Sequence, residues 1–450
     1  MKATMRWPHA IAWPLALVCT VALLGAAHAA QQQDQAAPSQ PPNVSQGAGD
    51  KDAADKDKPA EPKVSHQQER QAAQWALRVG GTAEVRTADG KNVTLSGGRA
   101  EVPEGNVVVL AIDVSNCAEV KDEGLEVLKG LSAIERLAMA NTNITDAGMA
   151  SLAGLKTITS LNLQNTKVGD SGVEQLKEMA ALAHLNLAGT NITDAAITTV
   201  SDLLELQTLD VSGTAVSSVN YLSGLEKLQR LNASNTKVAT LSLRQIKWLS
   251  LGGNAIGDRE LSRLSSLSSL THLELWRTGV NDNNVAGLAQ MTQLKHLNLA
   301  GTALTSAGLV KLRPLAGLES LDLTGTQIDD SGIEVLQSFP ELRTLSLAAT
   351  NISDRALDMM ANFRNRLQNL THLYLFRTPI TSRGLEQITT AAPNLVYLCL
   401  SGTQVGDRAV RYLRELPRLS EIELYDTAMT PAAIQQLRQA LPQLQVLASR

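Results

Sequence analysis

A repeating pattern of leucines and polar residues runs through most of the chain, and residues 159–182 show it clearly. Leu161 and Leu163 alternate with polar Asn162, which is the two-residue period of a short strand with one buried face. The chain then bends, and Val173 and Leu176 follow at helical spacing. One strand and one helix cannot bury their own apolar sides, so this unit must stack on copies of itself.

The copies recur in one register, mostly every 24 residues. The first strand leucine, or its substitute, falls at Leu137, Leu161, Leu185, Leu209, Leu231, Leu249, Leu273, Leu297, Leu321, Leu345, Leu373, Leu398 and Ile422. A degenerate copy precedes them at Ile112 and Val114. Because each unit needs its neighbours, we predict one continuous stack over residues 110–450.

The consensus of these copies, LxxLxLxxTxITDxGLxxLxxL, resembles the leucine-rich repeat. It is most similar to the cysteine-containing, F-box-like variety with an ITDxGL-type phrase, here with Thr in the Cys or Asn slot. The resemblance implies an α/β leucine-rich repeat solenoid, or horseshoe. Such a solenoid has a parallel β-sheet on its concave face and short helices on its convex face. The resemblance is specific for fold and weak for function, because these repeats serve many unrelated tasks.

Two polar positions recur at the same place in successive copies, and we call each recurring position a column. The Thr column occupies Thr142, Thr166, Thr190, Thr214, Thr236, Thr278, Thr302, Thr326, Thr350, Thr378, Thr403 and Thr427, with Asn254 replacing it once. We expect its hydroxyls to bond backbone groups that the bend leaves unpaired. The Asp column occupies Asp146, Asp170, Asp194, Asp258, Asp330, Asp354 and Asp407. We predict that these aspartates cap the convex helices and face their positive ends.

Two copies and the end of the array depart from the pattern. The copy from Leu231 to Leu249 is short, so we predict that it has lost most of its helix and that the curvature changes there. The copy from Leu345 to Leu373 is long. Glu421 and Glu423 fall on what the pattern predicts as the last strand, where charge discourages edge pairing. No separate carboxyl-terminal cap is recognisable, and an uncapped end allows the hypothesis of an end-to-end homodimer.

The segment before the repeats divides into three parts. Residues 1–29 have a basic start, an apolar run and an Ala27-His28-Ala29 exit, so we predict a signal peptide, and therefore a protein exported to the periplasm, the envelope or the medium. Residues 30–64 are almost free of large apolar side chains and predict a disordered linker. Residues 65–109 predict an amino-terminal cap, made of a helix with Trp75 and Ala76 on one face and a β-hairpin turning at Asp89-Gly90.

Composition limits the range of functions. The formal net charge is −4 and the pI is near 6.0, which argues against nucleic acid as a partner. No apolar run after the signal peptide is long enough to predict a membrane span. Cys117 and Cys399 lie on distant copies, so we predict no internal disulfide. The sequence holds no nucleophile elbow, phosphate-binding glycine loop or zinc-finger spacing, and we predict no enzymatic activity, cofactor or metal.

The candidate binding residues come from the strand positions expected to face the concave side. These are the residue before the first leucine, the one between the two leucines and the one after the second. Six of the 11 aromatic Phe, Trp and Tyr residues after residue 29 fall there. With neighbouring charged residues they give the predicted partner-binding set: Trp248, His272, Glu274, Trp276, Arg277, Tyr374, Phe376, Arg377, Tyr397, Glu423 and Tyr425. Trp, Tyr and Arg commonly anchor interfaces, although flat aromatics also pack across neighbouring strands.

The histidines in the first of these positions raise two further hypotheses. His272 and His296 should lie on adjacent strands, roughly 5 Å apart by strand spacing, with Glu274 nearby. Such a group could hold zinc or serve a hydrolytic reaction. Alternatively, a histidine before the strand leucine is an ordinary polar residue on a solvent-facing surface. We therefore predict neither a zinc site nor a hydrolytic site.

Taken together, the pattern predicts an exported, non-enzymatic scaffold that binds a protein or glycan partner through its concave face. The alternative function is substrate recruitment for a ubiquitin ligase, or imitation of it, because the ITDxGL phrase is similar to repeats in F-box receptors. Such receptors carry a helical F-box segment before the repeats. Residues 65–109 instead predict one helix and a hairpin.

Overall fold

The computed structural model describes residues 66–97, 100–239, 241–363 and 367–448. All of these belong to the second of two compact units, Pro62–Arg450. The predicted signal peptide, residues 1–29, and the predicted linker, residues 30–64, lie outside the described residues and stay predictions.

The amino-terminal end of the stack is covered by one helix and an antiparallel strand pair. Helix α2 (His66–Arg78) buries Ala72, Trp75 and Ala76. Strand β1 (Thr82–Thr87) pairs antiparallel with β2 (Asn92–Ser96), and also with β3 (Val107–Asp113) on its other side. The predicted helix and hairpin are therefore both present. Strand β3 then pairs in parallel with the first repeat strand, which joins this cap to the repeats.

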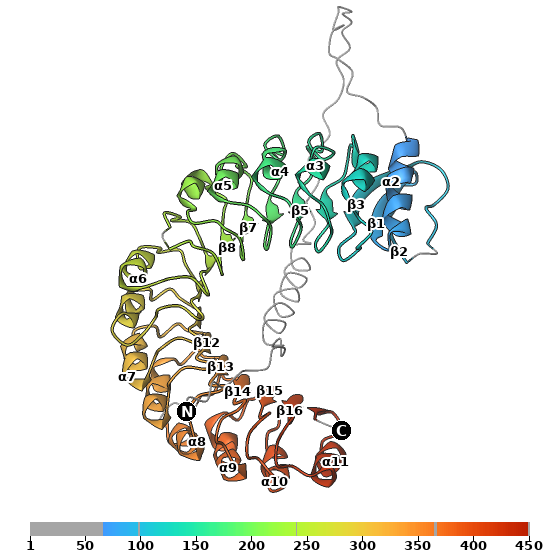
Figure 1. Cartoon of the computed structure of the whole chain (residues 1–450). Coiled ribbons are helices and arrows are strands. Elements are labelled where there is room, and N and C mark those ends of the chain that lie inside the picture. The colour runs from blue at the N-terminus through green and yellow to red at the C-terminus, as the bar shows by residue number, and fades with distance from the viewer. Residues whose placement is uncertain (1–65, 98–99, 240, 364–366, 449–450) are drawn as a thin grey trace, which may run out of the picture. The chain divides into compact units, whose positions relative to one another are not determined.

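The repeat strands form one open sheet, parallel from β3 onward (Figure 1). They are β4 (Arg136–Ala138), β5 (Ser160–Asn162), β6 (His184–Asn186), β7 (Thr208–Asp210), β8 (Arg230–Asn232), β9 (Trp248–Ser250), β10 (His272–Glu274), β11 (His296–Asn298), β12 (Ser320–Asp322), β13 (Thr344–Ser346), β14 (His372–Tyr374), β15 (Tyr397–Cys399), β16 (Glu421–Glu423) and β17 (Gln445–Leu447). Each central leucine pairs with its counterpart, as in Leu273 with Leu297. The predicted solenoid is confirmed.

Short helices line the opposite, convex side of the sheet (Figure 1). They are η1 (Asp122–Leu128), α3 (Asp146–Met149), α4 (Asp170–Glu174), α5 (Asp194–Val200), η2 (Asn220–Gly224), α6 (Asp258–Leu264), η3 (Val285–Gln290), α7 (Ser306–Leu309), η4 (Val310–Leu312), η5 (Asp330–Ser338), α8 (Asp354–Ala361), α9 (Ser382–Ala391), α10 (Ala409–Leu413) and α11 (Pro431–Ala440). The described residues between β8 and β9 contain no helix, as the short copy predicted.

At each bend, a side chain forms a hydrogen bond with a backbone carbonyl group, as predicted for the Thr column. All twelve threonine hydroxyls donate to the carbonyl three residues earlier, at 2.5–3.1 Å. Asn254 uses its amide instead and donates to the carbonyls of Ala233 and Val238. These groups sit in a continuous core of leucines, where an unpaired carbonyl would be costly.

The predicted capping role of the Asp column is wrong. The N-cap residues stand one position earlier, as with Thr145 of α3 and Thr193 of α5. All the aspartates of the column but Asp407 lie in the first helical turn, at the positive end of the helix as predicted. The carboxylate accepts hydrogen bonds from the cap of the next repeat. Asp170, for example, accepts from both the backbone N–H and the hydroxyl of Thr193, at 2.8 and 2.6 Å. The aspartates therefore tie neighbouring repeats together along the convex edge.

The same pair of bonds recurs along the array. The donors and acceptors are Thr145 with Asp122, Ser217 with Asp194, Thr305 with Asp282, Ser353 with Asp330, Thr381 with Asp354, and Thr430 with Asp407. The sequence could not show this, because each partner is a full repeat away.

The expected position of the last strand also needs correction. Strand β16 holds Glu421 and Glu423, but β17 follows it and pairs with it in parallel. The glutamates therefore do not face a free edge within the described residues. No helix in the described part of the chain is both long and apolar enough to cross a membrane.

Candidate functional site

The parallel register gathers the predicted binding residues on the concave side in three columns. The first column contains Trp248, His272 and Tyr397, and the middle column contains Glu274, Tyr374 and Glu423. Trp276, Phe376 and Tyr425 follow the second leucine and form the third column. There the backbone bonds continue, for example from Gly253 N to Trp276 O. Arg277 and Arg377 come directly after the third column. All eleven residues thus share one face or its edge.

None of the six aromatic side chains in these columns is buried. Trp248, Trp276, Tyr374, Phe376 and Tyr397 are half-buried. Tyr425 is 40% exposed. The leucines between them are buried, as with Leu273 at 1% exposure. The aromatics therefore neither scatter to other faces nor enter the core.

The first column contains a series of stacked side chains. The guanidinium of Arg230 lies 4.8 Å from the ring centre of Trp248 on the adjacent strand. The rings of His272 and His296 stack at 4.0 Å with an 11° angle between their planes. Two parallel rings present faces to each other and do not converge on one point. This arrangement suits stacking and does not suit shared metal coordination.

Burial lowers the pKa of the histidines in the first column. Burial chiefly, with His296 and Arg230 adding positive charge, lowers the pKa of His272 to about 4. Burial also lowers the pKa of His296, His184 and His372. Within the described residues, no group of three or more His, Cys, Asp and Glu is placed to hold a metal ion.

Around β10, a tryptophan and a glutamate pack on the neighbouring strand. A Cβ on Gly252 would lie 2.1 Å from the indole of Trp276, so this ring rests directly on the glycine backbone. The carboxylate of Glu274 accepts hydrogen bonds from the Ser250 hydroxyl, at 3.1 Å, and from the Trp276 side chain. Burial raises the pKa of Glu274. Glu274 is thus engaged in positioning Trp276.

A second aromatic group surrounds β14 and β15. The rings of Tyr374 and Tyr397 lie 4.9 Å apart, and His372 stacks on Tyr397 at 5.9 Å. The Cys399 thiol donates to Glu423 at 3.3 Å. Burial raises the pKa of Cys399 to about 12 and, together with the bond to Glu423, raises that of Tyr397. The thiol is therefore neutral and unreactive at ordinary pH.

The residue after the third column has left-handed backbone geometry in every repeat. Arg277 has φ +52° and Arg377 has φ +53°. The equivalent position in other repeats holds Asn116, Asn141, Asn165, Gly189, Gly213, Asn235, Gly253, Gly301, Gly325, Ala349, Gly402 and Asp426. Glycine and asparagine adopt this geometry most easily. Both arginines are exposed, and the guanidinium of Arg377 lies 5.0 Å from the ring centre of Phe376.

The amino-terminal half of the concave face is different. In the middle column, Asn162, Asn186, Asp210 and Asn232 each accept a hydrogen bond from the backbone N–H two residues ahead. Asn232 also donates to Asp210 at 2.9 Å. These polar side chains accept hydrogen bonds from nearby backbone N–H groups. Their presence is therefore explained by the needs of the fold and requires no binding partner.

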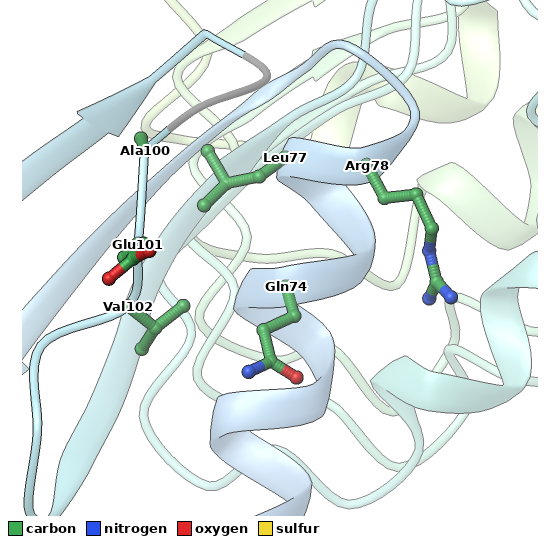
Figure 2. Close-up of a pocket in the computed structure, with 6 residues that line it drawn as sticks. All are labelled: Gln74, Leu77, Arg78, Ala100, Glu101 and Val102. Atoms are coloured by element: carbon green, nitrogen blue, oxygen red, sulfur yellow. The ribbon is translucent and has the colours of Figure 1, made fainter.

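A pocket of about 570 Å³ lies away from this surface, at the amino-terminal cap (Figure 2). Its lining residues are Gln74, Leu77, Arg78, Ala100, Glu101 and Val102. Figure 2 shows helix α2 on one side and the 100–102 segment on the other. None of the predicted binding residues lines it.

Three parts of the site were missed in the sequence analysis. Arg230 was not selected, although it occupies the first concave position of β8 and therefore carried the necessary signal. Gly252 was not recognised as the support of Trp276, because nothing in its own repeat marks it. The left-handed column was missed because its residue type varies, although a Gly or Asn before the recurrent Thr was a usable signal.

Comparison with known proteins supports the repeat architecture. A family model for a leucine-rich repeat matches residues 154–177, 290–312 and 318–336. Each window covers one repeat strand and all or part of the helix that follows it, namely β5 with α4, β11 with α7, and β12 with η5. A comparison with curated proteins found no match.

Several solved structures are similar to this chain. An internalin of Listeria monocytogenes is 20% identical, with 76% of this chain and 86% of that chain covered and a TM-score of 0.45. A leucine-rich repeat protein of Leptospira interrogans is 17% identical, with coverage of 71% and 80% and a TM-score of 0.44. The ectodomain of a plant membrane receptor kinase from Arabidopsis thaliana is 17% identical, with coverage of 78% and 51% and a TM-score of 0.40.

Proposed function

We propose that this chain, a leucine-rich repeat protein, is an exported, non-enzymatic scaffold that binds a protein partner on the concave face of β9–β16. One observation carries the proposal. Six half-buried or exposed aromatic side chains lie on that face, in a chain with only 3% aromatic residues. Aromatic and arginine side chains on a surface are the usual anchors of protein interfaces.

The contacts among these side chains support binding rather than oppose it. Trp276 rests on Gly252, Tyr374 lies against Tyr397, and Trp248 lies against Arg230. Each ring keeps an accessible part while its neighbours restrict its rotation. A side chain that is already ordered loses less entropy on binding, so this surface would gain affinity from preorganisation.

The chemistry of the face supports a scaffold rather than a catalyst. The ring of His272 is stacked on His296, and the carboxylate of Glu274 is held by Ser250 and Trp276. Both groups of the hydrolytic hypothesis are therefore occupied with packing. The substrate-recruitment alternative receives no support from the described residues 66–113. They form one helix and three strands, whereas an F-box segment is helical.

Export is part of the proposal and rests on the pattern of residues 1–29. We expect the protein isolated from its native cells to begin at Ala30, which peptide mass spectrometry of its amino terminus would establish. Recovery of peptides from within residues 1–29 in the isolated protein would contradict export by cleavage.

The binding proposal is tested with Phe376→Ala combined with Tyr425→Ala. The partner is first isolated by cross-linking and pull-down with the wild-type protein, and its affinity is then measured by calorimetry. Interface aromatics of this kind contribute roughly 2 kcal/mol each, so the loss of both should weaken binding by about a thousandfold if the two effects add. The melting temperature should change little, because Tyr425 is exposed and Phe376 is only half-buried.

Tyr221→Ala is the matched control, because Tyr221 is 62% exposed on the convex helix η2. It should leave affinity unchanged. If the double variant keeps its affinity, or loses stability in proportion to binding, the concave aromatics only pack and the proposal fails.

A further inference from the structure

The chain carries one phrase twice on the concave side. Residues 271–278 read THLELWRT and residues 371–378 read THLYLFRT. In each phrase, an aromatic residue in the third column is followed by an arginine in the left-handed position. We call Trp276–Arg277 and Phe376–Arg377 the two aromatic–arginine pairs.

The two phrases fold in the same way. The Thr271 hydroxyl lies 2.8 Å from Nδ1 of His272, and the corresponding distance from Thr371 to His372 is 2.9 Å. Each arginine stem crosses the glycine of the next repeat. A Cβ at Gly301 would lie 3.1 Å from Cγ of Arg277, and a Cβ at Gly402 would lie 2.9 Å from Cγ of Arg377. Both arginines are therefore directed along the edge of the sheet.

The backbone does not call for arginine at these positions. A β-carbon in left-handed geometry is disfavoured, and glycine or asparagine fills most equivalent positions. Strained positions that persist are often functional. Arg277 is exposed, so its charge is accessible to a partner.

The edge between the two pairs is small and uncharged. The third-column residues of β11, β12 and β13 are followed directly by their left-handed residues, giving Ala300 and Gly301, Thr324 and Gly325, and Ala348 and Ala349. A partner backbone could approach this stretch closely. Strands β10 and β14 are four strand spacings apart, which is about 19 Å.

We propose that the two aromatic–arginine pairs bind one extended, acidic peptide segment of the partner. An extended chain advances about 3.3 Å per residue, so carboxylates about six residues apart match the two guanidinium groups. The segment would lie across β11–β13 along the small-residue edge, with Trp276 and Phe376 flanking it. This inference rests on the proposed function, because it specifies the partner of the same face.

The test uses the full chain and fluorescent synthetic peptides of Gly, Ser and Thr that carry two glutamates. The spacings are two, four, six and ten residues, and a one-glutamate peptide is included. Fluorescence anisotropy at low salt should give the tightest binding near a spacing of six. Added salt should weaken it, because the contacts are charged and exposed.

Arg277→Gly and Arg377→Gly should each weaken binding of the six-spaced peptide by about three- to tenfold, to near the one-glutamate level of the wild type, and together they should weaken it below that level. Glycine suits the backbone at both positions, so these variants should fold at least as well as the wild type. Arg355→Ala on the convex helix α8 is the charge-matched control and should change nothing.

Equal binding at every spacing, binding that survives both glycine variants, or no binding of any peptide would overturn the inference. The failure of this inference can be distinguished from the failure of the proposed function. If Phe376→Ala with Tyr425→Ala abolishes capture of the isolated partner while both arginine variants retain it, the concave face binds but not through an acidic segment.

Discussion

The two halves of the concave face are built on the same backbone and use their side chains differently. On β5–β8, the middle-column residues Asn162, Asn186, Asp210 and Asn232 bond to their own backbone. On β9–β16, Glu274, Tyr374, Cys399 and Glu423 of the corresponding column bond or pack across to neighbouring strands. Within this half, Asn298 and Asp322 still accept from their own backbone, as the residues of the first half do. The first half is accounted for by folding, and the second half has a surplus of large side chains that folding does not require.

This difference shows where a solenoid can acquire a function without losing its fold. The leucines and the Thr bends are the same in both halves, so the core of the stack forms with either set of concave side chains. Aromatics placed there gain contacts with each other and retain an open face. Mutations in each half can measure whether its concave side chains stabilise the fold.

The largest effect is expected at Gly252→Ala. Its added methyl would meet the indole of Trp276 at 2.1 Å, so either the ring or the strand must move. Overpacking of this kind costs about 1–3 kcal/mol, and we expect about 2 kcal/mol in urea unfolding. The displaced ring should also change the tryptophan fluorescence of the native protein.

Gly224→Ala provides the control, because no atom lies within 4 Å of a Cβ built at Gly224. It should leave both stability and fluorescence unchanged. If Gly252→Ala were equally silent, Trp276 would not rest on this strand and the aromatic surface would be less ordered than described.

A smaller effect is expected in the other half, at Asn186→Ala. The change removes the acceptor of the Ala188 N–H, and such a bond contributes about 1 kcal/mol. Ser160→Ala, in the first column of the adjacent strand β5, should cost less. Chemical denaturation of both variants would show whether the middle-column amides stabilise the fold. If Asn186→Ala left the free energy of unfolding unchanged, the middle-column side chains of this half would not stabilise the fold, and the two halves would not differ in this respect.

The smallest effect is a pH dependence from His272. Its pKa is near 6.5 in the unfolded chain and about 4 in the fold, so the unfolded state binds more protons between these values. Stability therefore falls as the pH drops from 6.5 to 4. We expect about 1 kcal/mol, allowing for the partial exposure of the ring.

His272→Asn should remove that part of the acid loss, so the difference between wild type and variant should change with pH only below about 6.5. Unfolding in urea at pH 7.5, 5.5 and 4.5 measures it. A difference that stays constant with pH would show that the His272 ring titrates normally.

The fold was predictable because its main signal is local and periodic. Leu161 and Leu163, repeated as Leu185 and Leu187, define both the strand and its buried side, and the parallel register follows from equal spacing. The concave positions of Trp276 and Phe376 followed from the same alternation. Their burial did not, because it depends on neighbours such as Gly252 that belong to another repeat.

The Asp column shows where sequence reasoning reached its limit. Aspartate near a helix start normally indicates an N-cap, but Thr145, Thr193 and Ser353 already occupy that position. The carboxylate is then available for the following repeat. A pattern that repeats every 24 residues cannot distinguish a bond within one repeat from a bond to the next.

These inter-repeat carboxylate bonds give the array a direction. Each aspartate accepts from the repeat that follows it, as Asp170 does from Thr193. Removing a repeat from the carboxyl-terminal end leaves a carboxylate in water, where it is well solvated. Removing one from the amino-terminal end takes the acceptor away from a helix cap. During synthesis, each finished repeat thus presents a ready acceptor to the one made next, so growth from the amino terminus is the favoured order of assembly.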